Sequence, residues 1–187
     1  MGSKPDSFEN ARQAIISAAS NLMVKSDAHA TSLADIAKSL KMSKGTLYYY
    51  YSSKEQLIID VAEYHLASIT ERIFAWIDIV VRGTGASDAL KDLIEAILGE
   101  DELSGKLHLT LLHEAAMGNE TLQKRFAAKY REWSVMIEVG AMKALGTDAD
   151  RFKSKLYVFF AAIDGFLIQK AIGIEKLSRD DIVEAFV

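Results

Sequence analysis

A single proline, at position 5, is the feature that most limits the folds open to this chain of 187 residues. Proline removes a backbone donor and clashes with the preceding helical turn, so its absence after position 5 leaves long helices uninterrupted. Ala, Leu, Glu and Lys, which favour helices, are abundant, and long glycine-rich tracts are absent. The sequence therefore predicts an all-α protein whose length suits one or two small domains.

Three features that are missing from the sequence indicate the cellular compartment: cysteine, a signal peptide and a membrane-spanning run. Cysteine is absent, which excludes disulfides and thiolate metal sites and fits a reducing environment. The first residues are polar and do not resemble a signal peptide. The longest nearly uncharged run, residues 156–168, is too short for a bilayer, which needs about 20 residues. We therefore expect a cytoplasmic protein with no membrane partner.

Charge is distributed unevenly along the chain, whose net charge is −4. Residues 1–55 contain seven Lys or Arg and five Asp or Glu, a net charge of +2. Residues 56–187 contain fifteen and twenty-one, a net charge of −6. A mildly basic N-terminal part on an acidic remainder is compatible with DNA binding by the N-terminal part alone.

The N-terminal residues predict three helices in close succession, over about 7–25, 32–40 and 43–50. Ser32 and Asp35 have the spacing of a capping box at the start of the second helix. Ser43 can cap the third helix after a three-residue turn. Two short helices joined by such a turn, after a supporting helix, match the helix-turn-helix pattern.

The outward positions of the third helix suit a major groove. Lys44 can pair with phosphate or guanine, Gly45 allows close backbone approach, and Thr46 can contact a base edge or a thymine methyl. The start of the second helix favours a phosphate, and a lysine at the start of the fourth can add another phosphate contact. The candidate DNA-binding residues are Thr31, Ser32, Lys44, Gly45, Thr46, Tyr48, Tyr49, Tyr50 and Lys54. Singly, each has an ordinary structural explanation, and only their arrangement favours DNA.

Residues 31–57 resemble the signature of the TetR family of regulators nearly end to end, and residues 160–169 are weakly similar to that family's C-terminal dimer helix. The resemblance implies a DNA-binding domain at 1–53 and a helical ligand-binding and dimerisation domain at 54–187. It also implies a homodimeric repressor that a small molecule releases from a palindromic operator. Tyr51 stands where the family usually has phenylalanine, and we expect it to face the core.

Two departures from the family pattern affect the DNA-binding region. Lys41 replaces the usual glycine of the turn, and a left-handed conformation there would cost about 1 kcal/mol. Asp27 and Ala28 stand where the family usually has a glycine and an aromatic residue. These departures leave an alternative open, namely a helical small-molecule-binding or protein-interaction protein without DNA binding.

The run 156–168 is apolar around the whole helix, so it must be covered on all sides, and a second copy of the chain is a natural cover. The expected dimer contacts are Phe159, Phe160, Ile163, Phe166, Leu167, Ile182 and Phe186. The alternative is a helix buried within one protomer.

Aromatic residues at helical spacing suggest an apolar ligand cavity with a few polar groups. The candidate lining residues are His65, Trp76, His113, Met117, Phe126, Tyr130, Trp133 and Tyr157. Ordinary core packing is the alternative explanation for each of them. A long helix over 54–80 would connect this cavity to the DNA-binding region.

Catalysis finds little support in the sequence. His113 and Glu114 begin a zinc-protease motif, but the second histidine, required at position 117, is methionine. No phosphate loop, dinucleotide fingerprint or nucleophile elbow is present. We therefore expect no enzymatic activity, no cofactor and no metal.

Overall fold

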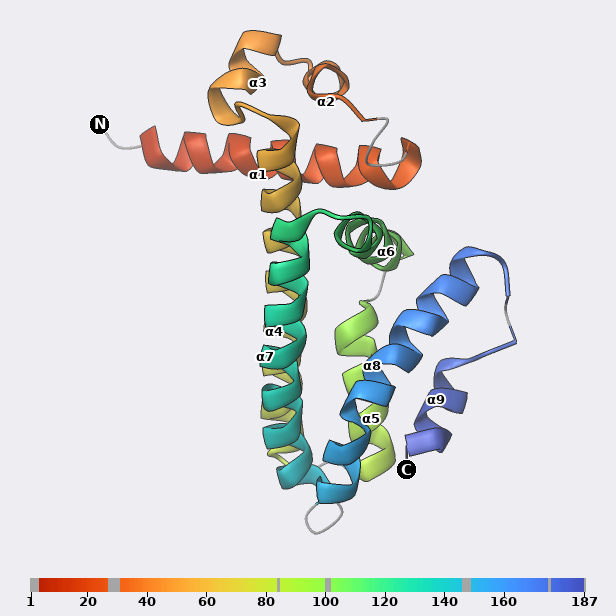
Figure 1. Ribbon diagram of the computed structural model, residues 1–187. Coiled ribbons are helices and arrows are strands. Elements are labelled where there is room, and N and C mark those ends of the chain that lie inside the picture. Colours follow the sequence, from red (N-terminus) through yellow and green to blue (C-terminus); the bar gives the residue numbers. More distant parts are fainter. Residues whose placement is uncertain are drawn as a thin grey trace.

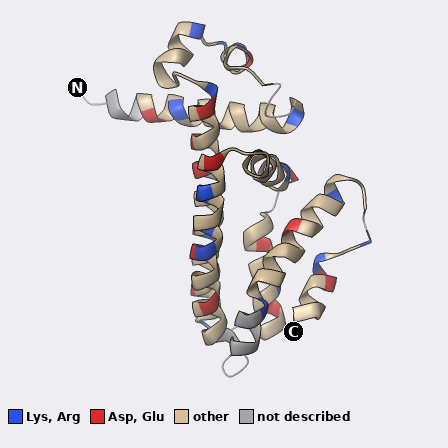
Figure 2. Ribbon diagram, in the orientation of Figure 1, with Lys and Arg blue, Asp and Glu red and all other residues tan. Residues whose placement is uncertain are grey.

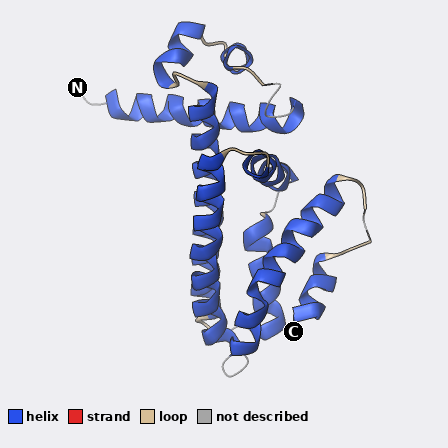
Figure 3. Cartoon of the chain, viewed as in Figure 1, coloured by secondary structure: helices blue, strands red, loops and turns tan. Residues whose placement is uncertain are grey.

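The computed structural model describes residues 4–26, 31–83, 85–99, 102–145, 149–174 and 176–186. The regular elements of these ranges are all helices, which confirms the predicted all-α class (Figure 3). In chain order they are α1 (Lys4–Ser26), α2 (Leu33–Ser39), α3 (Lys44–Tyr50), α4 (Lys54–Val80), α5 (Ala86–Leu98), α6 (Glu102–Ala116), α7 (Glu120–Leu145), α8 (Ala149–Ala171) and α9 (Arg179–Phe186). Asp27 and Ala28, two of the departures from the family pattern, lie outside the described residues.

Helices α1–α3 form a unit that we call the head, and α4–α9 form the body. In Figure 1, α1 lies across the end of α4, with α2 and α3 on its far side. Ile15 of α1, Ile36 of α2 and Leu47 of α3 are at most 2% exposed and belong to the buried core. Lys and Arg residues occur on all three head helices (Figure 2).

Both short head helices begin at serine caps, as predicted. Ser32 forms the capping box with Asp35, and Ser43 accepts a hydrogen bond from the Thr46 amide. These bonds satisfy backbone donors that a helix start leaves without intrahelical partners. Short helices of this kind depend on such caps because they have few internal hydrogen bonds.

The turn between α2 and α3 uses a left-handed residue, as its position in the motif predicts. Lys41 has φ +53°, the only positive φ outside glycine in the described chain. The Met42 amide donates to the Ala37 carbonyl at 2.9 Å, and the Lys41 amide donates to the Lys38 carbonyl at 3.2 Å. This pair of bonds is a Schellman motif, in which glycine is the usual left-handed residue. Lys41 therefore adopts a strained conformation that glycine would adopt freely.

Helix α4 runs from the head through the length of the body and lies beside α7 (Figure 1). Trp133 of α7 donates its Nε1–H to the Thr70 hydroxyl of α4 at 2.9 Å. Further along, a Cβ atom at Gly140 would collide with the Trp76 ring, so glycine is what allows the two helices to approach here. Trp76 is in turn fixed by a 2.7 Å hydrogen bond from its Nε1 to the Ala89 carbonyl of α5.

The inner face of α8 belongs to the core of a single protomer. Phe159, Phe160, Ile163, Phe166 and Ile182 are at most 7% exposed, and Leu167 and Phe186 are partly buried against the same core. Phe159 packs edge-to-face on Phe186, with ring centroids 5.3 Å apart. The five buried residues of this set are therefore covered by the chain's own helices, whereas Leu167 and Phe186 keep part of their surface exposed.

The part of the chain that the structure describes contains no helix with both the length and the hydropathy needed to cross a bilayer.

Candidate nucleic-acid interface and core cavity

Helix α3 exposes nearly every side chain that it carries. Leu47 is fully buried and attaches the helix to the head core, whereas Lys44, Gly45 and Thr46 are exposed. Tyr48 and Tyr49 are 55% and 76% exposed, which is unusual for such large aromatic side chains. The predicted outward row is thus present, and it presents a lysine, two small residues and two tyrosines to the exterior.

The cap of α3 also determines what Thr46 can offer. Its amide donates to the Ser43 hydroxyl at 3.0 Å, and the two hydroxyl oxygens lie 2.7 Å apart. Because the Thr46 hydroxyl is already hydrogen-bonded, its methyl group is the part better suited to a base. A threonine methyl can pack against the methyl group of thymine.

Tyr50 supports the other tyrosines and is only partly exposed. Its ring stacks on Phe8 of α1 at a centroid distance of 4.8 Å, and Tyr49 packs edge-to-face on Tyr50 at 5.5 Å. Phe8 also contacts Tyr49 edge-to-face, at 6.2 Å. Phe8 is not among the residues predicted for this site, because a position near the start of α1 gives no sign in sequence that the side chain reaches α3.

The three remaining candidates lie at helix starts. Thr31 is 4% exposed, so its side chain is not presented to the exterior. Ser32 is exposed, but its hydroxyl belongs to the capping box, and its hydrogen bonds lower the pKa of Asp35. Lys54 is partly exposed at the first position of α4. Of the three, Lys54 is the best placed for a phosphate.

Tyr51, at the C-cap of α3, faces the core as expected and is 1% exposed. It lies beside an ion pair in which Arg12 Nη2 of α1 is 2.7 Å from Asp60 Oδ2 of α4. Burial, and then the neighbouring Asp60 carboxylate, raise the pKa of Tyr51 to about 12. The ion pair and the buried ring together join α1 and α3 to the start of α4.

Inside the body, four polar side chains form a hydrogen-bonded series that we call the polar relay. His65 Nε2 of α4 lies 3.1 Å from His108 Nδ1 of α6. His108 Nε2 lies 3.1 Å from the hydroxyl oxygen of Tyr130 on α7. That hydroxyl donates to the Asp164 carboxylate of α8, at 2.9 Å and 3.0 Å from its two oxygens. The relay therefore joins four helices of the body.

The protonated state of Tyr130 determines which atoms beside it donate and which accept. Burial, and then the charge of Asp164, raise the pKa of Tyr130, so its hydroxyl keeps its proton and donates it to the carboxylate. The hydroxyl oxygen then accepts from His108 Nε2–H, and His108 Nδ1 faces His65 Nε2 on the other side of the ring. Burial, and then His108, lower the pKa of His65 to about 3, so His65 is neutral near pH 7.

Aromatic rings surround the relay and leave little space. Tyr130 lies 5.1 Å from Phe160 and 5.4 Å from Trp133 between ring centroids, and Phe126 lies 5.5 Å from His108. The cavity here has a volume of about 10 Å³, which is room for about one water molecule. Its lining residues are Ile97, His108, Tyr130, Trp133, Phe160, Ile163, Asp164 and Leu167.

The structure brings together half of the predicted ligand-binding residues. His65, Phe126, Tyr130 and Trp133 belong to the relay or to the rings around it, whereas Trp76 packs further along α4. The other three face outward: His113 is exposed, Met117 is 66% exposed and Tyr157 is 74% exposed. These three residues do not line the cavity.

Two polar members of the relay, His108 and Asp164, were missed by the sequence analysis. Asp164 had a visible signal, since it is the single charge within the apolar run 156–168. His108 had none, because a lone histidine on a helix is ordinary in sequence. In the described ranges, no three His, Cys, Asp or Glu side chains are grouped so as to hold a metal ion.

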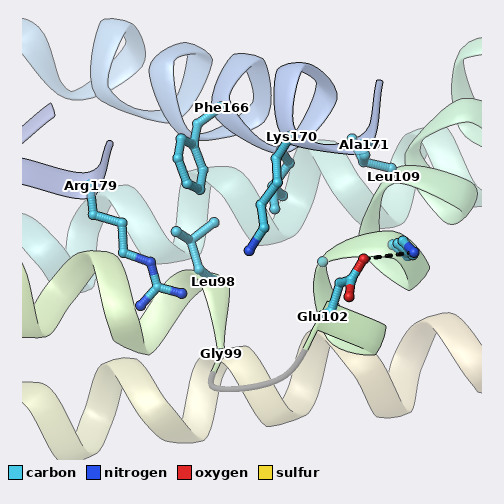
Figure 4. Close-up of a pocket in the computed structure, with 11 residues that line it drawn as sticks. Leu98, Gly99, Glu102, Leu109, Phe166, Lys170, Ala171 and Arg179 are labelled. Carbon is cyan, nitrogen blue, oxygen red and sulfur yellow. Dashed lines mark ion pairs between the residues drawn. The ribbon is translucent and has the colours of Figure 1, made fainter. Parts of the chain in front are cut away.

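A second, small pocket lies between the end of α5 and helices α6, α8 and α9 (Figure 4). Its volume is about 50 Å³, and the side chains of Lys170 and Arg179 lie on either side of the apolar Leu98 and Phe166 (Figure 4). Glu102 at its edge forms a 2.7 Å ion pair with Lys106. A pocket of this size admits only a few atoms.

Comparisons with known proteins agree with this architecture. Residues 15–61 match the family model described as bacterial regulatory proteins, tetR family. The chain is 28% identical over 167 residues to the HTH-type transcriptional regulator LmrA of Bacillus subtilis (strain 168). The aligned region covers 87% of each protein. It is 25% identical over 157 residues to the uncharacterized HTH-type transcriptional regulator YuxN of the same organism. This aligned region covers 83% of this chain and 53% of YuxN.

Solved structures show the same fold along nearly the whole chain. A transcriptional regulator from Saccharomonospora viridis, in complex with choline, has a TM-score of 0.76 at 21% identity and covers 95% of this chain and 94% of that one. A TetR-family regulator from Mesorhizobium loti has a TM-score of 0.74 at 20% identity and covers 95% of both chains. The fatty acid degradation regulator FadR from Bacillus halodurans has a TM-score of 0.70 at 17% identity and covers 94% of this chain and 91% of that one.

Proposed function

We propose that this chain, a DNA-binding transcriptional regulator of the tetR family, is a cytoplasmic repressor that leaves its operator when a small molecule binds the body. The observation that carries the proposal is the exposure of α3. This helix buries Leu47 and presents Lys44, Thr46, Tyr48 and Tyr49 outward. A side-chain row of this kind, on a helix braced from behind, suits insertion into a major groove.

Two kinds of DNA contact are expected: contacts to phosphates, which position the protein on the duplex, and contacts to base edges, which read the sequence. Lys44 and Lys54 would contact phosphates, since each lies at the first position of a helix and is exposed or partly exposed. Thr46 and Tyr48 would contact base edges from the groove. Tyr49, supported by Tyr50 and Phe8, would lie against the backbone at the groove edge.

The operator is palindromic if two copies bind it symmetrically, and α8 offers the surface for pairing. Tyr157, Val158 and Ile168 are 74%, 62% and 48% exposed and follow one side of the helix, and Ile172, just past its end, is 68% exposed. Gly165 lies between them, and the space where its Cβ would be is open. An exposed apolar stripe with a small residue at its centre suits close packing against its own symmetry copy. This face replaces the buried one expected from the sequence.

The polar relay and its aromatic surroundings are the proposed inducer site. The cavity has a volume of only about 10 Å³, so an inducer would enter by displacing side chains around Tyr130 and Phe160. The regulator from Saccharomonospora viridis is in complex with choline, and here the Asp164 carboxylate lies beside aromatic rings. Carboxylates and aromatic faces both attract organic cations. The proposed inducer is therefore a largely apolar small molecule, with a cationic group as the feature that Asp164 would recognise.

Helix α4 is the proposed link between this site and DNA. It carries His65 of the relay, and its first turn is held to the head by the Arg12–Asp60 ion pair. DNA binding requires the two α3 helices about 34–36 Å apart, one turn of DNA. A ligand that prefers a body conformation with another spacing lowers operator affinity by its differential affinity for the two states.

Selection of binding sites from a pool of random duplexes tests the proposed function. The expected result is an inverted repeat with half-site centres about one helical turn apart. Enrichment of no sequence would instead support a helical small-molecule-binding or interaction protein without DNA binding. Enrichment of an asymmetric site would contradict the symmetric dimer.

A further inference from the structure

Phe8 is a large aromatic residue near the start of α1 that does not belong to the buried core of the described chain. Its side chain is 41% exposed, whereas Ile15 on the same helix is fully buried. In Figure 1, α3 lies over the N-terminal half of α1, the half that contains Phe8. The match to the tetR family model begins only at residue 15. Neither core packing nor the matched motif therefore accounts for the contacts that Phe8 makes.

Phe8 forms a group of three rings with Tyr49 and Tyr50 of α3, which we call the ring cluster. The Phe8 ring stacks on Tyr50 with an interplanar angle of 30° and a centroid distance of 4.8 Å. The other two pairs meet edge to face, Tyr49 with Tyr50 at 5.5 Å and Phe8 with Tyr49 at 6.2 Å. All three distances lie within the roughly 4.5–7 Å over which aromatic pairs attract. Each ring therefore interacts with both of the others.

The two tyrosines of the ring cluster differ in how they are held. Tyr50 is partly buried and packs against the core, whereas Tyr49 is 76% exposed. Among the described residues, the Tyr49 side chain makes no hydrogen bond, and its ring contacts are those with Phe8 and Tyr50. The orientation of Tyr49 therefore depends on two rings, one of which Phe8 supplies.

Phe8 can hold Tyr49 in place because α1 is itself held. Arg12 lies four residues after Phe8, on the same face of the helix, and its Nη2 is 2.7 Å from Asp60 Oδ2 of α4. One face of α1 therefore contacts the start of α4 through Arg12 and the exposed side of α3 through Phe8. A side chain that is ordered before binding loses less conformational freedom when it meets its partner.

We propose that Phe8 is a positioning residue for DNA recognition, which holds the Tyr49 side chain, directly and through Tyr50, in the orientation that α3 presents to the duplex. The proposal rests on the DNA contact of α3 proposed above. Phe8 acts through the tyrosine, and its own contact with DNA is not required. The first turns of α1 then belong to the recognition surface, although they precede the residues that match the family model.

Nuclear magnetic resonance on the free protein, with ¹³C at the tyrosine ε carbons, tests the positioning without DNA. Relaxation of these carbons should report larger motion of the Tyr49 ring in Phe8→Leu than in the wild-type chain. Tyr48, which is 55% exposed on the same helix and has no ring contact with Phe8, should keep its motion. Unchanged motion of Tyr49, or an equal change for Tyr48, overturns the proposal.

Fluorescence anisotropy with the duplex that random-site selection enriches measures the consequence for binding. Phe8→Leu should weaken binding by about fivefold or more, because a mobile tyrosine must then be ordered in each protomer of the proposed dimer. Phe8→Tyr retains the ring and should stay within about twofold of the wild-type affinity. Equal losses in these two variants, or wild-type affinity in Phe8→Leu, overturn the proposal.

Phe74→Leu is the matched control, since it makes the same substitution at a 57% exposed position on α4. Its affinity should also stay within about twofold of the wild-type value. Phe8 lies outside the core, so Phe8→Leu is expected to fold, which circular dichroism checks. An unfolded Phe8→Leu variant would show that Phe8 has a structural role, and this result too overturns the proposal.

Tyr49→Ala determines whether Phe8 acts through Tyr49. In this background, Phe8→Leu should change DNA affinity by less than about twofold, because the side chain that Phe8 positions is gone. A similar loss in both backgrounds would mean that Phe8 contacts DNA itself or stabilises the head, and overturns the proposal. Failure of the wild-type chain to enrich any sequence would contradict DNA recognition as a whole. Additive losses in a chain that does bind contradict only the positioning role of Phe8.

Discussion

Tyr130 donates its hydroxyl proton to Asp164, at 2.9 Å and 3.0 Å from the two carboxylate oxygens, and so joins α7 to α8 inside the body. The same hydroxyl accepts from His108. Removing it would take from the Asp164 carboxylate its hydrogen-bond donor and leave His108 Nε2 3.6 Å from a carboxylate oxygen, in a largely buried environment. The cost of such a loss is larger than the net contribution of one hydrogen bond.

Tyr130→Phe should therefore lower the free energy of unfolding by about 1–3 kcal/mol. Urea denaturation followed by circular dichroism measures this change. Tyr64→Phe on α4 is the matched control, because Tyr64 is 50% exposed and lies outside the stripe on α8, and its effect should stay within about 0.5 kcal/mol. Equal, small effects in the two variants would show that the relay does not contribute to stability.

The pH dependence of stability should report His65. In the unfolded chain its pKa is the ordinary 6.5, whereas burial, and then His108, lower the folded-state pKa to about 3. Between these values the unfolded state binds a proton that the folded state does not, so stability falls as the pH drops below 6.5. Between pH 7 and pH 5, the wild-type chain should lose about 2 kcal/mol more than His65→Gln, which cannot titrate.

His113→Gln is the control for this comparison, since His113 is exposed on α6. Its stability should fall with pH as steeply as that of the wild-type chain. Urea denaturation at several pH values gives the three curves. Parallel curves for wild type and His65→Gln would contradict the neutral, buried state of His65.

Lys41→Gly should stabilise the head by about 1 kcal/mol, because glycine adopts the left-handed conformation without the steric cost that Lys41 bears. For a chain of this length the midpoint of thermal unfolding should rise by about 2–4 °C. Lys38→Gly, one turn earlier within α2, should have the opposite effect because glycine weakens a helix interior. A decrease in both variants would contradict the strain at Lys41.

The exposed stripe on α8 predicts a dimer that a single charge disrupts. Ile168 is 48% exposed in the protomer, so Ile168→Glu should fold but remain monomeric. Val135→Glu on α7, where the side chain is 63% exposed, is the control and should sediment as a dimer like the wild-type chain. Analytical ultracentrifugation distinguishes the two forms. A dimeric Ile168→Glu variant would place the interface on another surface.

The helices of the head were predictable from sequence because the caps and turns that define them join residues that are close in the chain. Caps lie within three residues of what they bind, as with Ser32 and Asp35, and the left-handed turn at Lys41 follows from its position between two short helices. The buried state of Tyr51 followed from the resemblance to a family in which an apolar ring stands there. Phe8 was not predictable, because its contact with Tyr50 joins segments that are distant in sequence.

The body is less predictable from sequence, because helical periodicity does not determine which helices pack together. A helix that is apolar all around gives no sign of which face the protomer covers, so the sequence does not show that Phe159 and Ile163 lie in the core of one protomer. The aromatic stripe that includes Tyr130 and Trp133 did indicate a cluster. Its polar partners His108 and Asp164 come from other helices, and their meeting depends on tertiary packing.

DNA binding by α3 is tested most directly by fluorescence anisotropy with the duplex that random-site selection enriches. Replacing Lys44 and Tyr48 together by alanine should weaken binding by about 100-fold or more, since both are exposed on α3 and each contact would be made twice in the proposed dimer. Tyr64→Ala, at a 50% exposed position on α4, should bind as the wild-type chain does. Wild-type affinity in the folded double variant would contradict recognition by α3.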